Sequence, residues 1–244
     1  MTPVWRNEAG GLTFEGAAGS DRVFVKWSPP GGSHDLDQEV ARLHWAAACT
    51  SVVVPVPLAW GSDASGSWLM TAALPGASAV SEAWLEDPQR AVVGIGEGLR
   101  ALHDALPAPG CPFSWTAEDR TADAQRQAEA GGLDPASWHD VHQSLSVPQA
   151  LHLLREPPPV DRLVVCHGDA CAPNTLLDEH GSYTGHVDLG RLGLADRWAD
   201  LAVATWSTGW NYGLGWENTL LSAYGVSPDP RRIAYYRLLW DLSS

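Results

Sequence analysis

The stretch VVCHGDACAPN, residues 164–174, decides the fold of this chain. A short apolar run breaks off into His167, Gly168 and Asp169, and five residues later Asn174 opens a second apolar run. Short β-type runs interrupted by glycine and proline are typical of strands joined by a loop. The pattern therefore predicts an acid and an amide in a loop between two strands.

The residues after this stretch predict a β-hairpin. Its strands are 175–178 and 183–187, joined by a turn at 179–182. If Asp178 pairs near Tyr183, the antiparallel register places Asn174 nearly opposite Val187 and Asp188, within about 5.5 Å between α-carbons. An amide oxygen beside a carboxylate suits Mg²⁺, which takes few protein ligands and completes its shell with water and phosphate. We therefore expect Asn174 and Asp188 to hold Mg²⁺ and Asp169 to act on the group that reacts there.

Charge and composition exclude several classes of protein. The chain has 244 residues and a net charge of −14, which repels nucleic acid and anionic membranes. No run of 18 apolar residues predicts a membrane span, and the N-terminus lacks a secretory pattern. The four cysteines have no C-x-x-C spacing, so we expect reduced thiols and a cytoplasmic protein.

The only lysine among the 15 basic residues is Lys26, on a predicted strand at 23–27. Ser33 is expected to cap the helix that follows. The apolar stripe of this helix is Leu36, Val40, Leu43 and Ala47. Glu39 lies at the edge of the stripe, where a carboxylate needs a cation. Lys26, Glu39, the H-x-D-x-x-x-x-N loop and Asp188-Leu189-Gly190 follow the order of a protein-kinase site.

The remaining pattern predicts an α+β fold with two lobes. Further strands are expected at 52–60 and 68–74, and Asp87-Pro88 is expected to begin a helix. Other expected helices are 119–130, 146–155, 196–208, 216–224 and 230–240. We predict a small N-terminal antiparallel sheet with one helix (1–73) and a larger, mostly helical lobe (74–244) that carries the hairpin.

The motifs at 164–174 and 186–202 closely resemble those of the aminoglycoside phosphotransferases, particularly the 3′ and 3″ types. The resemblance covers most of the chain. It implies a two-lobed, protein-kinase-like fold and transfer of the γ-phosphate of ATP or GTP to a hydroxyl of a cationic antibiotic. Such transfer inactivates the drug and gives resistance, and the resemblance leaves a monomer or a homodimer open.

The resemblance also implies a role for each matching residue. Asp169 would be the catalytic base, and Asn174 and Asp188 would hold Mg²⁺. Lys26 would contact the α- and β-phosphates, with Glu39 fixing it. Backbone groups of Leu69, Thr71 and Ala73 would meet the adenine.

This chain departs from the family pattern at both ends. Family members usually have a strand ahead of the region matching Val4-Trp5-Arg6, so the N-terminal lobe is expected to be truncated at its start, with weaker nucleotide binding if that strand is absent. The segment 204–211, where the 3′ enzymes carry acids, has none. For the substrate we therefore expect contacts from Asp140, Trp210, Asp241 and Ser244.

Plainer roles and other classes of protein stay open. We expect His167 to brace its loop, Asp196 to do so too, and Asp200 to be an ordinary helix-start residue. The tryptophans Trp198, Trp206, Trp210, Trp216 and Trp240 are expected mainly in the core. The alternatives are a streptomycin-type 3″ enzyme or another small-molecule kinase, a metal-dependent hydrolase, which needs histidines in ligand spacing, and a catalytically weak, kinase-like ligand-binding protein.

Overall fold

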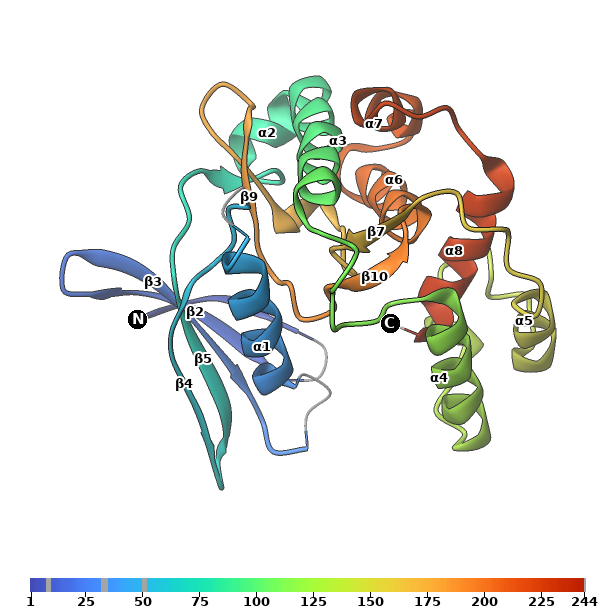
Figure 1. Cartoon of the computed structure of the whole chain (residues 1–244), viewed down its shortest axis with the longest axis horizontal. Helices are drawn as coiled ribbons and strands as arrows, with labels where there is room; N and C mark the ends of the chain where they lie inside the picture. The colour runs from blue at the N-terminus through green and yellow to red at the C-terminus, as the bar shows by residue number, and fades with distance from the viewer. Residues whose placement is uncertain (8–9, 32–34, 50–51, 244) are drawn as a thin grey trace.

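The computed structural model describes residues 1–7, 10–31, 35–49 and 52–243. Its N-terminal sheet is antiparallel, with strands in the order β1-β2-β3-β5-β4 in the described part of the chain. The strands are β1 (Thr2–Arg6), β2 (Leu12–Ala18), β3 (Asp21–Ser28), β4 (Pro57–Asp63) and β5 (Gly66–Ala72). Helix α1 (Leu36–Ala47) lies against this sheet, apart from the other helices (Figure 1).

The predicted strand boundaries are partly wrong. The strand expected at 52–60 begins only at Pro57, because Pro55 and Pro57 lack the N–H groups that an earlier pairing needs. The strand expected at 68–74 runs from Gly66 to Ala72. Two strands, β1 and β2, precede the Lys26 strand in the sheet, and β1 covers Val4-Trp5-Arg6, the region before which a strand was expected to be missing.

Helix α1 is capped and buried almost as the sequence predicts. Asp35 caps it by accepting a hydrogen bond from the Gln38 N–H at 3.1 Å, whereas Ser33 lies outside the described residues. The buried residues on its core face are Leu36, Glu39, Val40, Leu43 and Ala46. Ala46 takes the place predicted for Ala47, which is exposed, because the helix turns position 46 toward the core.

The larger part of the chain is mainly helical (Figure 1). Its helices are α2 (Glu82–Glu86), α3 (Pro88–Ala105), α4 (Ala117–Glu129), α5 (Val147–Leu153), α6 (Trp198–Tyr212), α7 (Glu217–Tyr224) and α8 (Pro230–Ser243). Short 3₁₀ turns cover Pro135–Ser137 and Ala172–Asn174. Asp87 caps α3 through the Arg90 N–H, as predicted. In the described residues, no helix combines the length and apolar character that a bilayer crossing needs.

Two small sheets carry the decisive stretch. Strand β7 (Leu163–Cys166) pairs with β10 (Gly193–Asp196), while β8 (Thr175–Leu177) pairs with β6 (Ala77–Ser78) and β9 (Tyr183–His186). Thr175 lies opposite His186, and the Val187 N–H donates to the Asn174 carbonyl at 3.0 Å. The predicted pairing at the open end of the hairpin is therefore confirmed, since Val187 faces Asn174 and Asp188 directly follows. Near the turn the prediction is wrong by one residue, because a register shift between Leu176 and Leu177 puts Leu177, and not Asp178, opposite Tyr183.

The buried apolar residues form two clusters. The larger one unites α3, α6, α7 and α8. The smaller one, which we call the shared core, joins Leu36, Val40 and Leu43 of α1 to Leu189 and Leu192. Because Leu189 directly follows Asp188, this packing ties α1 to the segment that carries one of the predicted metal ligands.

Candidate active site

Lys26 lies between two carboxylates. Its Nζ is 2.6 Å from Glu39 Oε1 and 2.8 Å from Asp188 Oδ1. Burial alone lowers the pKa of Lys26, but the charges of Asp188 and Glu39 outweigh it and raise that pKa above its ordinary value. Lys26 is therefore a fixed ammonium, as the sequence predicts, and strand β3, helix α1 and the Asp188 segment meet at it.

Asp188 has an unusual backbone. Its φ of 64° is the only positive value among the described residues other than glycine. Aspartate tolerates this left-handed region better than most residues, yet such conformations cost free energy and concentrate at functional sites. The turn carries the chain from β9 toward the shared core and aims the Asp188 carboxylate at Lys26.

Asn174 is oriented by the loop that carries Asp169. Its Nδ2 donates to the Asp169 carbonyl at 3.0 Å, which leaves the amide oxygen as the group that a ligand can meet. The Asn174 backbone is bonded to Val187, next to Asp188. The structure thus places an amide and a carboxylate at the open end of the hairpin, where the sequence expects them.

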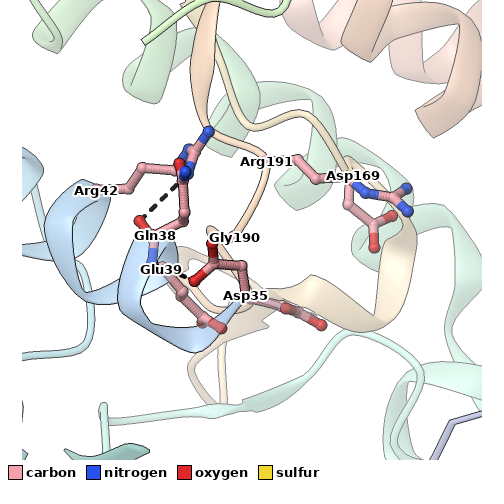
Figure 2. Close-up of a pocket in the computed structure, with 8 residues that line it drawn as sticks. Asp35, Gln38, Glu39, Arg42, Asp169, Gly190 and Arg191 are labelled. Carbon is pink, nitrogen blue, oxygen red and sulfur yellow. Dashed lines mark hydrogen bonds between the residues drawn. The ribbon is translucent and has the colours of Figure 1, made fainter. Parts of the chain in front are cut away.

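Asp169 and Asp188 line one cavity of about 270 Å³. The cavity is also lined by Asp35, Gln38, Glu39, Arg42, Gly190 and Arg191, most of them labelled in Figure 2. Asp169 Oδ1 is buried and has no hydrogen-bond partner in the described part of the chain. Buried polar atoms in native proteins nearly always have a partner, so this oxygen is an exception among the described residues, and it belongs to the residue predicted to be the base.

Asp200 holds the loop at 167–174 in place. This fully buried carboxylate accepts hydrogen bonds from the His167 N–H at 2.6 Å, the Gly168 N–H at 3.0 Å and His103 Nε2 at 2.9 Å. Burial by itself raises the pKa of Asp200. The hydrogen bond and charge of His103, together with the charge of His167, outweigh burial and lower this pKa. The expectation that Asp200 is an ordinary helix-start residue is wrong.

Asp196 has the role expected of Asp200. It caps the start of α6 by accepting from the Trp198 N–H at 3.1 Å and also accepts from the Asp161 N–H at 2.9 Å. Neither partner belongs to the loop at 167–174. The sequence assigned the brace to Asp196, and the structure gives it to Asp200, four residues further along the same helix start.

His167 links the loop to the hairpin. The Asp169 N–H donates to its Nδ1 at 3.2 Å, so its Nε2 carries the proton and donates to the Val187 carbonyl at 3.0 Å. Both ring nitrogens are occupied by the backbone, and the residue is fully buried. The predicted bracing role of His167 is confirmed.

The segment expected to meet adenine lies at the end of β5. Leu69 is fully buried opposite Lys26 in β3, and Thr71 is paired inside the sheet. The Ala73 N–H donates to the Arg22 carbonyl at 3.0 Å. Sheet pairing does not support an adenine contact by the backbones of Leu69 and Thr71, and a contact through Ala73 stays a prediction.

The acids expected to bind substrate are largely engaged within the protein. Asp241 Oδ2 is 2.6 Å from His142 Nδ1, and the His139 N–H donates to Asp241 at 3.3 Å. Asp140 is exposed, and its carboxylate lies 2.6 Å from His139 Nδ1. Ser244 lies outside the described residues. The cationic part of an acceptor would therefore compete with histidines for these two carboxylates.

The tryptophans near these acids divide into core and surface. Trp206 is buried and stacks on His139 with ring centroids 4.2 Å apart, while Trp210 is 48% exposed. The Trp206 and Trp210 centroids are 5.6 Å apart. Trp198 is also core, as expected, so Trp210 is the indole of this group that a ligand can reach.

Comparison with known proteins identifies the family. The phosphotransferase enzyme family matches residues 11–236. An aminoglycoside 3′-phosphotransferase of Streptomyces ribosidificus is 39% identical over 227 residues, covering 87% of this chain and 82% of the relative. A streptomycin 3″-kinase of Streptomyces griseus is 33% identical over 248 residues, covering 96% and 88%. This chain belongs to the aminoglycoside phosphotransferase family.

Solved structures of the family confirm the kinase-like α+β fold. The crystal structure of an aminoglycoside-3′-phosphotransferase of type VIII is 30% identical, with a TM-score of 0.83 over 98% of this chain and 92% of the other. A 3″ aminoglycoside phosphotransferase from Streptomyces rimosus, in complex with ADP and streptomycin, is 25% identical, with a TM-score of 0.78 over 98% and 92%.

The sequence prediction missed some residues of the site of this aminoglycoside phosphotransferase. Arg191, Arg42, Gln38 and Asp35 all line the cavity. Arg191 could have been found, since it directly follows Asp188-Leu189-Gly190. The other three had no signal of their own, because only the packing of α1 on the shared core brings them to the cavity.

Proposed function

We propose that this protein is an aminoglycoside O-phosphotransferase that moves the γ-phosphate of ATP to a hydroxyl of an aminoglycoside antibiotic, most closely like the 3′ enzymes, and so inactivates the drug. One observation carries the proposal: Asp169, whose buried Oδ1 has no hydrogen-bond partner among the described residues, lines one cavity with Asp188, and Asp188 is ion-paired with Lys26. The relative that binds ADP and streptomycin supports a nucleotide as the phosphate donor.

In the proposed reaction, the acceptor hydroxyl oxygen attacks the γ-phosphorus. A new O–P bond forms, the bond from the γ-phosphorus to the β,γ-bridging oxygen breaks, and ADP leaves with that oxygen. The hydroxyl proton passes to Asp169 Oδ1. Lys26 contacts the α- and β-phosphates, and Glu39 keeps it in place. Phosphoryl transfer leaves the protein little covalent work, so positioning and charge neutralisation supply most of the catalysis.

Mg²⁺ suits the donors that the hairpin brings together. The Asn174 Nδ2 donates to the Asp169 carbonyl, which leaves the amide oxygen for a ligand, and the Asp188 side chain is 44% exposed. Hard oxygen donors of this kind are the ligands that Mg²⁺ prefers. When bound, the ion would neutralise charge on the phosphates.

The proposal divides the work between two parts of the chain. Residues 1–73 would bind the nucleotide, with ATP as the first candidate and GTP as the second, and residues 74–244 would bind the acceptor and carry the base. The four cysteines are free thiols, which supports action in the cytoplasm. A streptomycin-type 3″ activity is the second candidate, favoured by the 33% identity to the streptomycin 3″-kinase.

A phosphate-transfer screen tests the function. Purified protein is given ATP or GTP with Mg²⁺ and, in turn, a kanamycin-like, a streptomycin-like and an uncharged sugar acceptor. We expect transfer to an aminoglycoside, and a loss of about 10²- to 10⁴-fold in kcat for Asp169→Asn with the fold intact. Near-normal turnover by Asp169→Asn would remove Asp169 as the base.

Lys26→Met tests the nucleotide side of the same site. We expect a raised KM for ATP and a lowered kcat, because the α- and β-phosphates lose their ammonium. Unchanged kinetics would show the lysine to be incidental. Two results together exclude a catalytically weak binding protein. ATP with Mg²⁺ raises the Tm of Asp169→Asn, which shows nucleotide binding, and the unaltered protein transfers phosphate with normal turnover.

A further inference from the structure

Arg191 brings a positive charge to the cavity beside the proposed base. It directly follows Gly190 and lines the cavity together with Asp169 and Asp188. Arg191 and Asp169 both line this cavity, and Figure 2 draws them on the side of the view away from Arg42. The ion pairs found in the described part of the chain do not include Arg191.

Among the residues that the structure describes, the Arg191 guanidinium contacts two indole rings instead of a carboxylate. Its guanidinium carbon is 5.8 Å from the centre of the Trp115 ring and 5.4 Å from that of Trp240. Cation–π contacts attract a guanidinium without neutralising its charge. The side chain is therefore restrained, and its positive charge remains for another anion.

A second guanidinium lies behind Trp115. Arg120 is 1% exposed, its guanidinium carbon is 4.6 Å from the centre of the same ring, and its two terminal nitrogens have no hydrogen-bond partner among the described residues. Burial and then the charge of Arg191 lower the pKa of Arg120 to about 10. Both cations thus raise the positive potential at this wall of the cavity.

The Arg191 backbone is fixed against the loop of the proposed base. Gly168 has a φ of +84°, and a Cβ added there would lie 2.2 Å from the Arg191 carbonyl oxygen. No side chain fits between them, so the two segments are in direct contact. The Arg191 backbone is therefore held against the loop that carries Asp169, and the two indoles restrain its side chain.

The other arginine that lines the cavity is engaged, and so is Lys26, which pairs with the lining residues Glu39 and Asp188. Arg42 donates through Nε to the Leu192 carbonyl at 2.9 Å and through Nη1 to Gln38. Lys26 is paired with two carboxylates. Arg191 alone, of the cavity cations in the described residues, has no such oxygen partner. In the proposed reaction, the anion that reaches this cavity is the phosphate chain of the nucleotide.

We infer that Arg191 is a further catalytic residue, whose guanidinium contacts the oxygens of the phosphoryl group during transfer. The inference rests on the proposed function. The phosphoryl oxygens carry negative charge while the bond from phosphorus to the leaving ADP breaks and the bond to the acceptor oxygen forms. A guanidinium offers paired N–H donors to phosphate oxygens. Trp115 and Trp240 are positioning residues for it.

Kinetics of Arg191→Ala and Arg191→Lys test this role. We expect Arg191→Ala to lower kcat by about 10²- to 10³-fold while the KM for ATP changes about threefold or less, as for a contact made mainly in the transition state. Arg191→Lys keeps the charge but loses the planar contact with the indoles, so we expect a smaller loss. A kcat of Arg191→Ala within about threefold of normal overturns the inference.

Chemical rescue separates a lost guanidinium from a disturbed fold. Millimolar methylguanidinium should raise the kcat of Arg191→Ala at least about tenfold, a gain of about 1.4 kcal/mol, and leave Arg100→Ala unchanged. Arg100 is a suitable control because its guanidinium is paired with Asp104 at the surface. Absence of rescue in an Arg191→Ala protein with normal Tm overturns the inference. If Arg191→Ala does not fold, Arg191→Lys decides: a lowered kcat with an unchanged KM for ATP supports the inference, and an unchanged kcat overturns it. Failure of the unaltered protein to transfer phosphate would instead refute the proposed function.

Discussion

Two aspartates with little exposed side chain each hold a loop through a histidine and backbone N–H groups. Asp200 accepts from His103 and from backbone N–H groups of the loop before Asp169. Asp241 accepts from His142 and from the His139 N–H, which belongs to the loop beside Trp206. Each carboxylate thus joins a helix to a loop, and each has a histidine as its second support.

The two differ in their surroundings. The Asp200 side chain is 1% exposed and the Asp241 side chain is 9% exposed, next to a half-exposed indole at Trp210. A charge in a dry interior needs all of its hydrogen bonds, whereas one near water can exchange a partner. The comparison teaches that Asp200 holds the loop before Asp169 in one geometry, whereas the contacts of Asp241 can change partners more easily; under the proposed function, that freedom would lie on the acceptor side.

The largest expected effect comes from Asp200→Asn. The amide cannot accept from two N–H groups and a histidine at once, so we expect about 3 to 5 kcal/mol of lost stability and almost no transfer. Denaturant unfolding and kcat measure the two effects. Asp196→Asn is the matched control, since it keeps one oxygen for the Trp198 N–H and loses the hydrogen bond from the Asp161 N–H, at about 1 to 2 kcal/mol. Equal losses in the two variants would contradict the assignment of the brace to Asp200.

Acid unfolding extends the same comparison. The pKa of Asp200 is lowered in the folded protein, below the ordinary value of 3.8. Its ionised form therefore contributes stability at pH values above about 3.8, and this contribution is lost as the pH falls below that value toward the folded-state pKa. Asp200→Asn should thus unfold with a weaker pH dependence below pH 4 than the unaltered protein.

Asp241→Asn should have an intermediate effect. Its loss frees the loop at 139–142, and hydrogen bonds to charged groups are worth about 1.5 to 3 kcal/mol. We expect the KM for the aminoglycoside to rise about tenfold while kcat stays within about threefold. Steady-state kinetics with the best acceptor measure both. A fall in kcat without a change in KM would show that Asp241 acts on the transfer step instead.

The smallest effect is expected for Trp210→Ala. Trp210 is 48% exposed, so stability should change by about 0.5 kcal/mol or less, and the acceptor KM should change by a few fold. Trp206→Ala is the contrasting variant, because Trp206 is buried and its loss should cost about 3 to 5 kcal/mol. A strongly destabilised Trp210→Ala would place this indole in the core after all.

The sequence predicted the centre of the site well because its geometry is local. Hairpin register follows from spacing, which brought Asn174 to the residue beside Asp188. The pairing of Lys26 with Glu39 follows from a lone lysine on a strand and a carboxylate on the edge of an apolar stripe. Both are short-range patterns with a single satisfactory solution.

Other parts could not be predicted because they depend on packing between distant segments. Asp196 and Asp200 both lie at the start of one helix, and only the position of His103 on α3 shows which one reaches the loop. Asp241 was expected to bind substrate, but His142, 99 positions earlier, already holds it. Nothing in the sequence indicated that Arg191 would lie between two indoles.

The shared core fixes the position of helix α1. Moving α1 outward would expose Leu36, Val40 and Leu43 to water, at about 1.5 to 3 kcal/mol for each side chain. Glu39 belongs to this helix, so moving it away from Lys26 would require the same exposure of apolar side chains. Folding that buries α1 in the shared core therefore also brings Glu39 to Lys26, and separating the two would carry this cost in exposed apolar surface.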